Sequence, residues 1–136
     1  MSNSAPDGDP LRELLVDAVK VDRQAIADAV KERVAIDPNS GRLLLLRGYQ
    51  GLESRRKVLC ILLARKAAVL LEVSDSEVLT NKEIAQLSGL APGTAAPSVR
   101  SLKELRLVDQ DENRAYFVPN PRLLDAIEFL TAGGPA

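Results

Sequence analysis

The chain has 136 residues, a formal net charge of -1 and 46% hydrophobic residues. That length favours one domain with extensions, and the presence of two Phe, two Tyr and no Trp predicts a core of aliphatic side chains. There is no His and a single Cys. These counts exclude a four-ligand Cys/His zinc site, a His-dependent nucleophile and an internal disulfide. We therefore expect no metal and no cofactor.

Residues 1–10 contain no apolar segment of the kind that a secretory signal needs. The longest apolar stretch, 58–73, contains Arg65, Lys66 and Glu72, and it is shorter than the roughly 20 residues that span a bilayer. We expect a soluble, cytoplasmic protein with no membrane association.

The charges are unevenly distributed along the chain. Residues 1–41 carry 5 basic and 8 acidic side chains, residues 42–66 carry 7 basic and 1 acidic, and residues 67–136 carry 6 basic and 10 acidic. Because phosphates respond to the local field, the near-neutral total does not forbid nucleic-acid binding.

In the N-terminal region, the small polar residues at 1–8 predict a disordered tail. The apolar residues that follow at helical spacing predict a helix over 10–35. Asp9 and Pro10 are an N-cap and a first helical residue. Asp22 either caps a second helix or lies on the solvent face of one long helix, so a break near 21–22 is possible. The apolar stripe of this segment is rich in Ala and Val. It predicts packing on another helix, in this chain or in a partner chain.

The turn signal 37–41 (DPNSG) and the apolar run 43–46 predict a short strand, followed by a connection at Gly48 and Gly51. Ser54 begins a central helix with its body over 55–73. This helix is apolar on nearly all sides, which predicts burial on nearly all sides. Cys60 is expected to be a buried small hydrophobe, and one or both of the cations at 65 and 66 are expected to reach water.

The stretch 80–117 predicts helix, turn, helix and hairpin. Thr80 and Glu83 match a capping box, and Gly89 ends the first helix, followed by Leu90. After the turn 91–93, Thr94 is the predicted N-cap of the second helix and Pro97 falls in its first turn, with the buried face at Val99, Leu102 and Leu105.

A short β-hairpin is predicted next. Leu107 and Val108 lead into its first strand, 109–113 is polar turn material, and 114–118 is the return strand. A last amphipathic helix follows over 121–130, and 131–136 is a frayed tail of small residues.

Residues 55–118 resemble the winged helix-turn-helix superfamily of prokaryotic and viral transcription regulators. The resemblance rests on the capping box, Ala85, Gly89 and Leu90, and on the helix SVRSLKELRL with its exit into the wing. It implies a mostly α fold with a small β-hairpin wing and with helical extensions at both ends. The expected organisation is a tail at 1–8, a helical extension with a short strand at 9–52, the winged helix-turn-helix at 53–120, and a helix with a tail at 121–136.

The resemblance also implies a DNA-binding transcriptional regulator that reads duplex DNA with the helix 94–106, supported by the basic residues within 42–66. Ala95 falls on the implied groove-facing side of that helix. Arg100 is the one side chain in the first half of the helix that is able to contact guanine in a bidentate manner. The implied DNA-binding residues are Thr94, Ser98, Arg100, Ser101, Lys103, Arg114, Arg55, Arg56 and Lys57.

One feature departs from the DNA-binding pattern. The front of the reading helix, AAPS, is small and uncharged, and the wing carries Asp109, Asp111 and Glu112 against Arg114. Carboxylates at the wing repel a phosphate backbone at close range. The alternative function is therefore a winged-helix module for protein interaction or oligomerisation without DNA. In either case we expect a homodimer through 10–35 and 121–130. We expect no enzymatic activity, because SGLAPGT also lacks the glycine spacing and the Lys of a P-loop.

Overall fold

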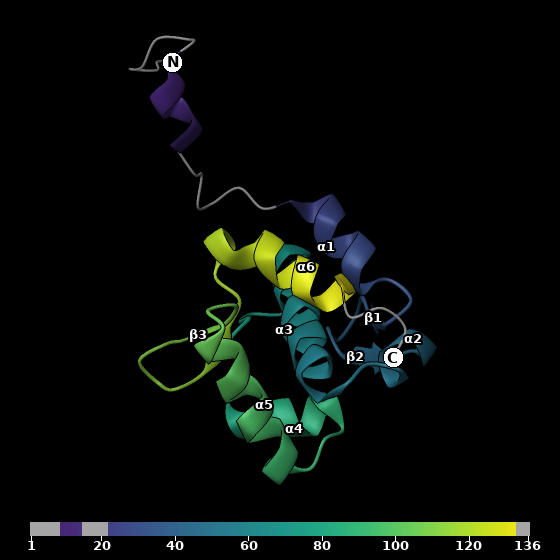
Figure 1. Ribbon diagram of the computed structural model, residues 1–136. Coiled ribbons are helices and arrows are strands. Elements are labelled where there is room, and N and C mark those ends of the chain that lie inside the picture. Colours follow the sequence, from purple (N-terminus) through teal and green to yellow (C-terminus); the bar gives the residue numbers. More distant parts are fainter. Residues whose placement is uncertain (1–8, 15–21, 133–136) are drawn as a thin grey trace.

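The computed structural model describes residues 9–14 and 22–132, and Figure 1 shows their arrangement around one central helix. This part of the chain is mostly helical and contains two small antiparallel sheets, β1–β2 and β3–β4. The predicted fold class is confirmed in these terms. In chain order the elements are η1 (Pro10–Leu14), α1 (Arg23–Val30), β1 (Val34–Ile36), β2 (Leu43–Leu45), α2 (Arg47–Gln50), α3 (Ser54–Leu70), α4 (Asn81–Ser88), α5 (Pro92–Glu104), β3 (Asp109–Gln110), β4 (Tyr116–Phe117), η2 (Asn120–Arg122) and α6 (Leu123–Ala132).

The central helix α3 is buried on nearly all sides, as its sequence predicts. Leu59, Ile61 and Leu63 are fully buried although they point in different directions around the helix. In Figure 1, α1 and α6 cover one end of α3, while α4 and α5 cover the other. Each fully buried Leu or Ile contributes about 1.5–3 kcal/mol. Every other helix of the body therefore obtains much of its stability from α3.

The N-terminal extension differs from the predicted helix over 10–35. Pro10–Leu14 is a short 3-10 helix, and α1 begins at Arg23, with the Asp22 carboxylate accepting a hydrogen bond from the N–H of Ala25 at 2.9 Å. The helix ends at Val30, and residues 34–36 form a strand instead. The predicted tail at 1–8, the segment 15–21 and the end of the C-terminal tail at 133–136 lie outside the described residues.

The helix stops at Val30 because a β-hairpin takes over the next residues. Glu32 adopts a left-handed φ of 71°, and Val34 pairs with Leu45 in the β1–β2 register. The N–H of Gly48 donates to the carbonyl of Glu32 at 3.0 Å, and a Cβ at Gly48 would lie 2.4 Å from that oxygen. Only glycine allows this close approach. The predicted strand at 43–46 is confirmed, whereas its partner β1 and the one-turn helix α2 were not predicted.

The helix-turn-helix matches its predicted capping. Thr80 and Glu83 form the reciprocal capping box of α4, and Gly89 ends α4 with a φ of 77°. The start of α5 was predicted wrongly at Thr94, because Ala91 is the N-cap and Pro92 is the first helical residue. Proline is favoured there, since its φ is already helical and its missing N–H has no intrahelical partner. Pro97 therefore lies inside α5 and not in its first turn.

Three smaller boundaries also differ. Helix α3 ends at Leu70 and not at Val73, because Glu72 turns left-handed with a φ of 62°. Asp109 and Gln110 belong to a strand and not to the turn, and α6 continues to Ala132.

The wing is attached to the rest of the fold by the backbone. Leu79, just before α4, exchanges backbone hydrogen bonds with Tyr116 at 2.7 and 2.9 Å.

Of the two adjacent cations Arg65 and Lys66, one or both of which were expected to reach water, Lys66 is buried in an ion pair and Arg65 is partly exposed. Lys66 is 3% exposed, and its Nζ donates to Glu77 Oε1 at 3.0 Å and to the carbonyl of Val118 at 2.9 Å. Arg65 donates from Nε to the carbonyl of Ser76 at 2.9 Å. Because a buried ammonium loses its hydration, it needs such partners. Lys66 therefore fastens the loop before α4 and the end of the wing to α3.

We expect a double-mutant cycle over this pair to show coupling. Glu77→Gln leaves the buried ammonium without a counter-charge and should lower the free energy of unfolding. Lys66→Met removes the charge but keeps the apolar stem. The cycle should return a coupling energy of about 1–3 kcal/mol in chemical denaturation. Glu128→Gln, an exposed carboxylate on α6, is the matched control, and an additive cycle would contradict the structural role.

Candidate nucleic-acid interface

The exposed face of α5 is positioned by its opposite face. Ala95, Val99 and Leu102 are buried, and α5 packs against both α3 and α4. The predicted buried position Leu105 is instead 47% exposed, because α5 ends at Glu104 and Leu105 is its C-cap. Packing of one stripe turns the remaining side chains of α5 to solvent.

That outer face carries few charges. Thr94, Pro97 and Arg100 are exposed in the first two-thirds of α5, and Lys103 and Glu104 follow near its end. Arg100 makes no side-chain hydrogen bond or ion pair to any residue in the described part of the chain. Its guanidinium is therefore available to a partner, with five donors that suit guanine or phosphate.

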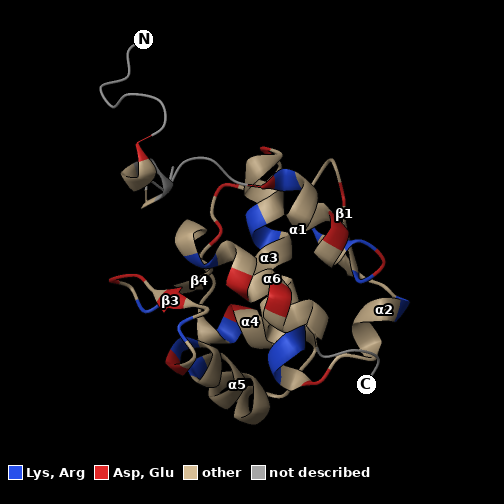
Figure 2. Ribbon diagram, turned by 45° about the horizontal axis from the view of Figure 1, so that its top comes forward, with Lys and Arg blue, Asp and Glu red and all other residues tan. Residues whose placement is uncertain are grey.

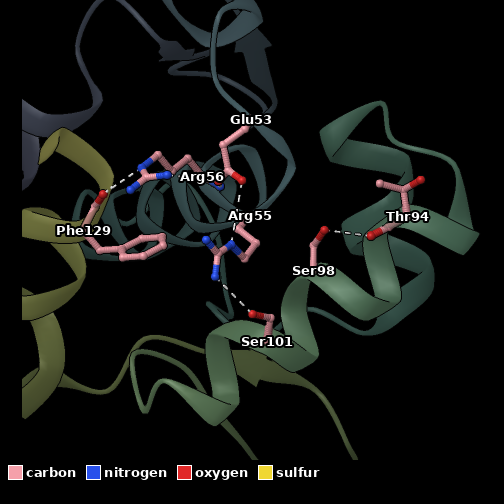
Figure 3. A network of polar contacts seen from close by, with 7 residues as sticks. All are labelled: Glu53, Arg55, Arg56, Thr94, Ser98, Ser101 and Phe129. Atoms are coloured by element: carbon pink, nitrogen blue, oxygen red, sulfur yellow. Dashed lines mark hydrogen bonds and ion pairs between the residues drawn. The ribbon is translucent and has the colours of Figure 1, made fainter. Parts of the chain in front are cut away.

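Two predicted groove-facing positions point inward. Ala95 is 1% exposed and belongs to the core, which corrects its expected placement. Ser98 is 7% exposed, and its hydroxyl donates to the carbonyl of Thr94 at 2.8 Å, as Figure 3 shows. Serine side chains inside helices commonly donate to the carbonyl four residues back in this way. Because its proton is used and its side chain is buried, the Ser98 hydroxyl is poorly placed to bind a ligand.

The three cations at the start of α3 are engaged within the chain. Glu53 caps α3 by accepting from the N–H of Arg56 at 2.9 Å, and its carboxylate also lies 3.3 Å from Arg56 Nη1 and 3.7 Å from Arg55 Nε. Lys57 places its Nζ 5.6 Å from the centroid of the Tyr49 ring. A carboxylate at a helix N-terminus offsets the unfavourable position of cations there.

Phe129 of α6 is the second partner of this cluster (Figure 3). Its carbonyl accepts from Arg56 Nε at 2.9 Å, and its ring centroid lies 4.3 Å from Arg56 Cζ and 5.3 Å from Arg55 Cζ. The last carbonyls of a helix lack intrahelical partners, and cations stabilise that end. Arg55 also donates from Nη1 to Ser101 Oγ at 3.3 Å. The predicted residues Arg55 and Ser101 are thus brought together, and their bond joins α3 to α5.

The basic residues within 42–66 do not form one surface. Lys66 is buried, whereas Arg42 and Arg47 are exposed on the β1–β2 side of α3. In Figure 1 that side lies across α3 from the wing. The positive charge of this segment, which is contiguous in sequence, is therefore divided among several faces.

The wing has acidic residues at its turn, and one of them is structural. The Asp111 Oδ1 accepts from the N–H groups of Asn113 and Ala115, each at 2.9 Å, which shapes the turn. Glu112 and Arg114 are exposed, and Arg114 adopts a left-handed φ of 63°. Figure 2 shows the acidic residues on β3 and its turn and basic residues at the adjacent end of α5.

Sequence reasoning missed two exposed cations beside the wing, Arg106 and Arg122. Arg106 follows the C-cap of α5, Leu105, and Arg122 belongs to η2. Arg106 is the last residue of the predicted helix 94–106, and that position was a usable signal. Arg122 is distant in sequence, so only the fold places it there.

The interior contains two ionisable groups with raised pKa values. Burial raises the pKa of the Cys60 thiol to about 12, opposed in part by the charge of Arg33. Burial also raises the pKa of Tyr49, whose hydroxyl donates to the carbonyl of Ser88 at 2.6 Å. Both groups stay protonated and inert near neutral pH. Among residues 9–14 and 22–132 no cluster of acidic or Cys side chains is arranged to hold a metal, and no helix is long and apolar enough to cross a bilayer.

We expect Cys60 to resist a thiol-disulfide reagent at pH 8 in the native protein and to react within seconds to minutes once unfolded. The folded thiol keeps its proton to higher pH than the unfolded thiol, whose pKa is about 8.5. The same difference means that the free energy of unfolding falls as pH rises above that value. Absorbance of the released reagent group measures the reaction, and rapid labelling of folded protein would contradict the burial.

The match to a known family agrees with this geometry. The family model of the IclR helix-turn-helix domain matches residues 63–112, which run from the second half of α3 through α4 and α5 into the wing. The match covers less than half of the chain. No curated protein and no solved structure matches the chain significantly.

The arrangement of α3, α4, α5 and the β3–β4 hairpin, together with that match, defines the class of domain. The chain contains a winged helix-turn-helix of the transcription-regulator type. The predicted resemblance is confirmed. Domains of the matched kind bind DNA and are not catalytic.

Proposed function

We propose that the protein is a transcriptional regulator that binds duplex DNA through the outer face of α5. The observation that carries the proposal is Arg100, an exposed guanidinium that has no partner among the described residues. It lies at the middle of the helix that this fold presents to the major groove. Thr94 and Lys103 are also exposed, at the two opposite edges of this face of α5. Because a transcriptional regulator acts where the DNA is, we assign the protein to the cytoplasm.

The cations at the start of α3 support α5 in this proposal. Arg55 is half-buried and bonded to Ser101, so it can meet a phosphate only beside α5. Arg56 and Lys57 are half-buried against Phe129 and Tyr49. We assign Arg55 a phosphate contact that also fixes the angle of α5, and we assign the discrimination between sequences to Arg100.

We expect Arg100→Ala to weaken binding of a fluorescent pool of random duplexes by about 5-fold or more, as the loss of a charge-assisted contact implies. Wild-type binding should fall steeply between about 50 and 200 mM salt. Fluorescence anisotropy measures both effects. Arg47→Ala is the matched control, because Arg47 is an exposed arginine at the start of α2, and Figure 1 shows α2 across α3 from the wing. Absence of binding at low salt, or binding indifferent to salt, would refute DNA binding.

A second function, self-association, is favoured by an apolar groove. The groove has a volume of about 460 Å³ and lies between α1, β1 and the end of α3. Its walls include Val30, Ile36 and Leu71, and Leu71 is 57% exposed. The two segments that were predicted to form the dimer contact, 10–35 and 121–130, partly bury each other's apolar side chains, because α1 packs on α6 within the chain. We therefore assign the homodimer contact to this groove and to Leu11 and Leu14, which are 66% and 75% exposed.

We expect the wild-type chain to have the mass of a dimer in light scattering after size exclusion, and Leu71→Glu to shift it to a monomer, because a carboxylate in an apolar interface loses its hydration. Leu105→Glu is the control, since Leu105 is a similarly exposed leucine at the end of α5. A wild-type monomer at all concentrations, or equal effects of the two variants, would refute the groove as the contact. A dimer that binds no duplex would favour the interaction module.

A further inference from the structure

A small hollow lies between the end of α5 and the base of the wing. Its volume is about 210 Å³, which leaves room for a phosphate group. It is lined by Lys103, Arg106, Val108, Asp109, Pro119 and Arg122. Residues from α5, β3 and η2 thus meet at one place, although they are up to 19 positions apart in the chain.

The cations of the hollow are weakly engaged by the protein itself. Arg106 is exposed and its side chain makes no hydrogen bond or ion pair within residues 9–14 and 22–132. Arg122 lies 3.9 Å from Asp125, with 46% of its side chain exposed. An exposed pair at that distance is worth little, so Arg122 is readily recruited by another anion.

The remaining polar groups of the hollow leave it positive. Lys103 Nζ donates to Gln110 Oε1 at 2.7 Å, a neutral acceptor that does not cancel its charge. Asp109 is the one acidic residue of the lining, and its Oδ1 accepts from the N–H of Gln110 at 2.8 Å. Three cations against one carboxylate, converging from three elements, form a site that attracts an anion.

We propose that this hollow binds a phosphate of the DNA backbone beside the groove occupied by α5. The inference rests on the proposed DNA binding and adds a phosphate site to it. Two guanidinium forks suit the oxygens of a phosphate better than point charges do. The site also reconciles the negative charge of the wing turn with DNA binding. The acidic turn at 111–112 projects beyond the contact, and the base of the wing supplies the positive charge.

The test compares two variants that lose the same charge. Arg106→Gln/Arg122→Gln removes the guanidinium forks of the hollow, and Arg42→Gln/Arg47→Gln removes two exposed arginines from the β1–β2 side of α3. Fluorescence anisotropy on one duplex over a range of salt gives the slope of log affinity against log salt. The hollow variant should reduce the magnitude of that slope by about 0.9, the value for one phosphate, and weaken binding about three- to tenfold. The Arg42→Gln/Arg47→Gln variant should change neither the slope nor the affinity.

Further arms separate the possible failures. Arg106→Lys/Arg122→Lys keeps the charge and should retain the slope, and thermal melting verifies that all variants fold. If wild type binds duplex DNA and the hollow variant keeps the full slope, the inference is overturned and DNA binding stands. If wild type binds no duplex, DNA binding fails. Thermal melting with and without millimolar inorganic pyrophosphate then tests whether the hollow binds phosphate groups at all. A rise in the melting temperature of wild type that the hollow variant lacks supports a site for free phosphates. No rise overturns the proposal of a phosphate site in the hollow.

Discussion

The burial of α3 on nearly all sides is the constraint on which the rest of the structure depends. A helix without a polar face cannot fold alone in water, so it must be covered by elements from both ends of the chain. Helices α1 and α6 cover one part, and α4 with α5 cover another. One continuous core runs from Ile26 in α1 to Leu130 in α6. The winged helix-turn-helix and its extensions therefore share their stability, and a ligand or a second chain that binds an extension acts on the same core that positions α5.

The cluster of Arg55, Arg56 and Phe129 shows how charge is used inside this arrangement. Cations at a helix N-terminus are unfavourable by themselves. Here Glu53 lies beside both guanidinium groups, and Phe129 in the last part of α6 provides a carbonyl acceptor and an aromatic face. The bond from Arg55 to Ser101 continues the connection into α5. The cluster thus joins three helices, and the orientation of α5 depends in part on the contact between Arg55 and Phe129 of α6.

The side of the molecule that carries the outer face of α5 and the wing has little positive charge. The front of α5 carries no charge, and the turn of the wing is acidic. Positive charge is found at Arg100, at the end of α5 and at the base of the wing, while the basic segment 42–66 is distributed around α3 and partly buried. Such a surface provides few phosphate contacts per chain. A second copy would double them without enlarging the patch, which connects self-association to affinity.

The sequence by itself determined the local features. Each of these features was predicted because its cause lies within a few positions of the chain. They are the capping box at Thr80, the left-handed Gly89, the turn at 37–41 and the apolar side chains on nearly all sides of α3. Tertiary structure decided what depends on distant partners. Val34 to Ile36 became a strand because Leu43 to Leu45 lies beside them. Lys66 became buried because Glu77 and Val118 converge on it. Arg106 and Arg122 came to share one hollow because the wing returns the chain to the end of α5. Pairing and burial are properties of two or more segments, so no single stretch of sequence carries them.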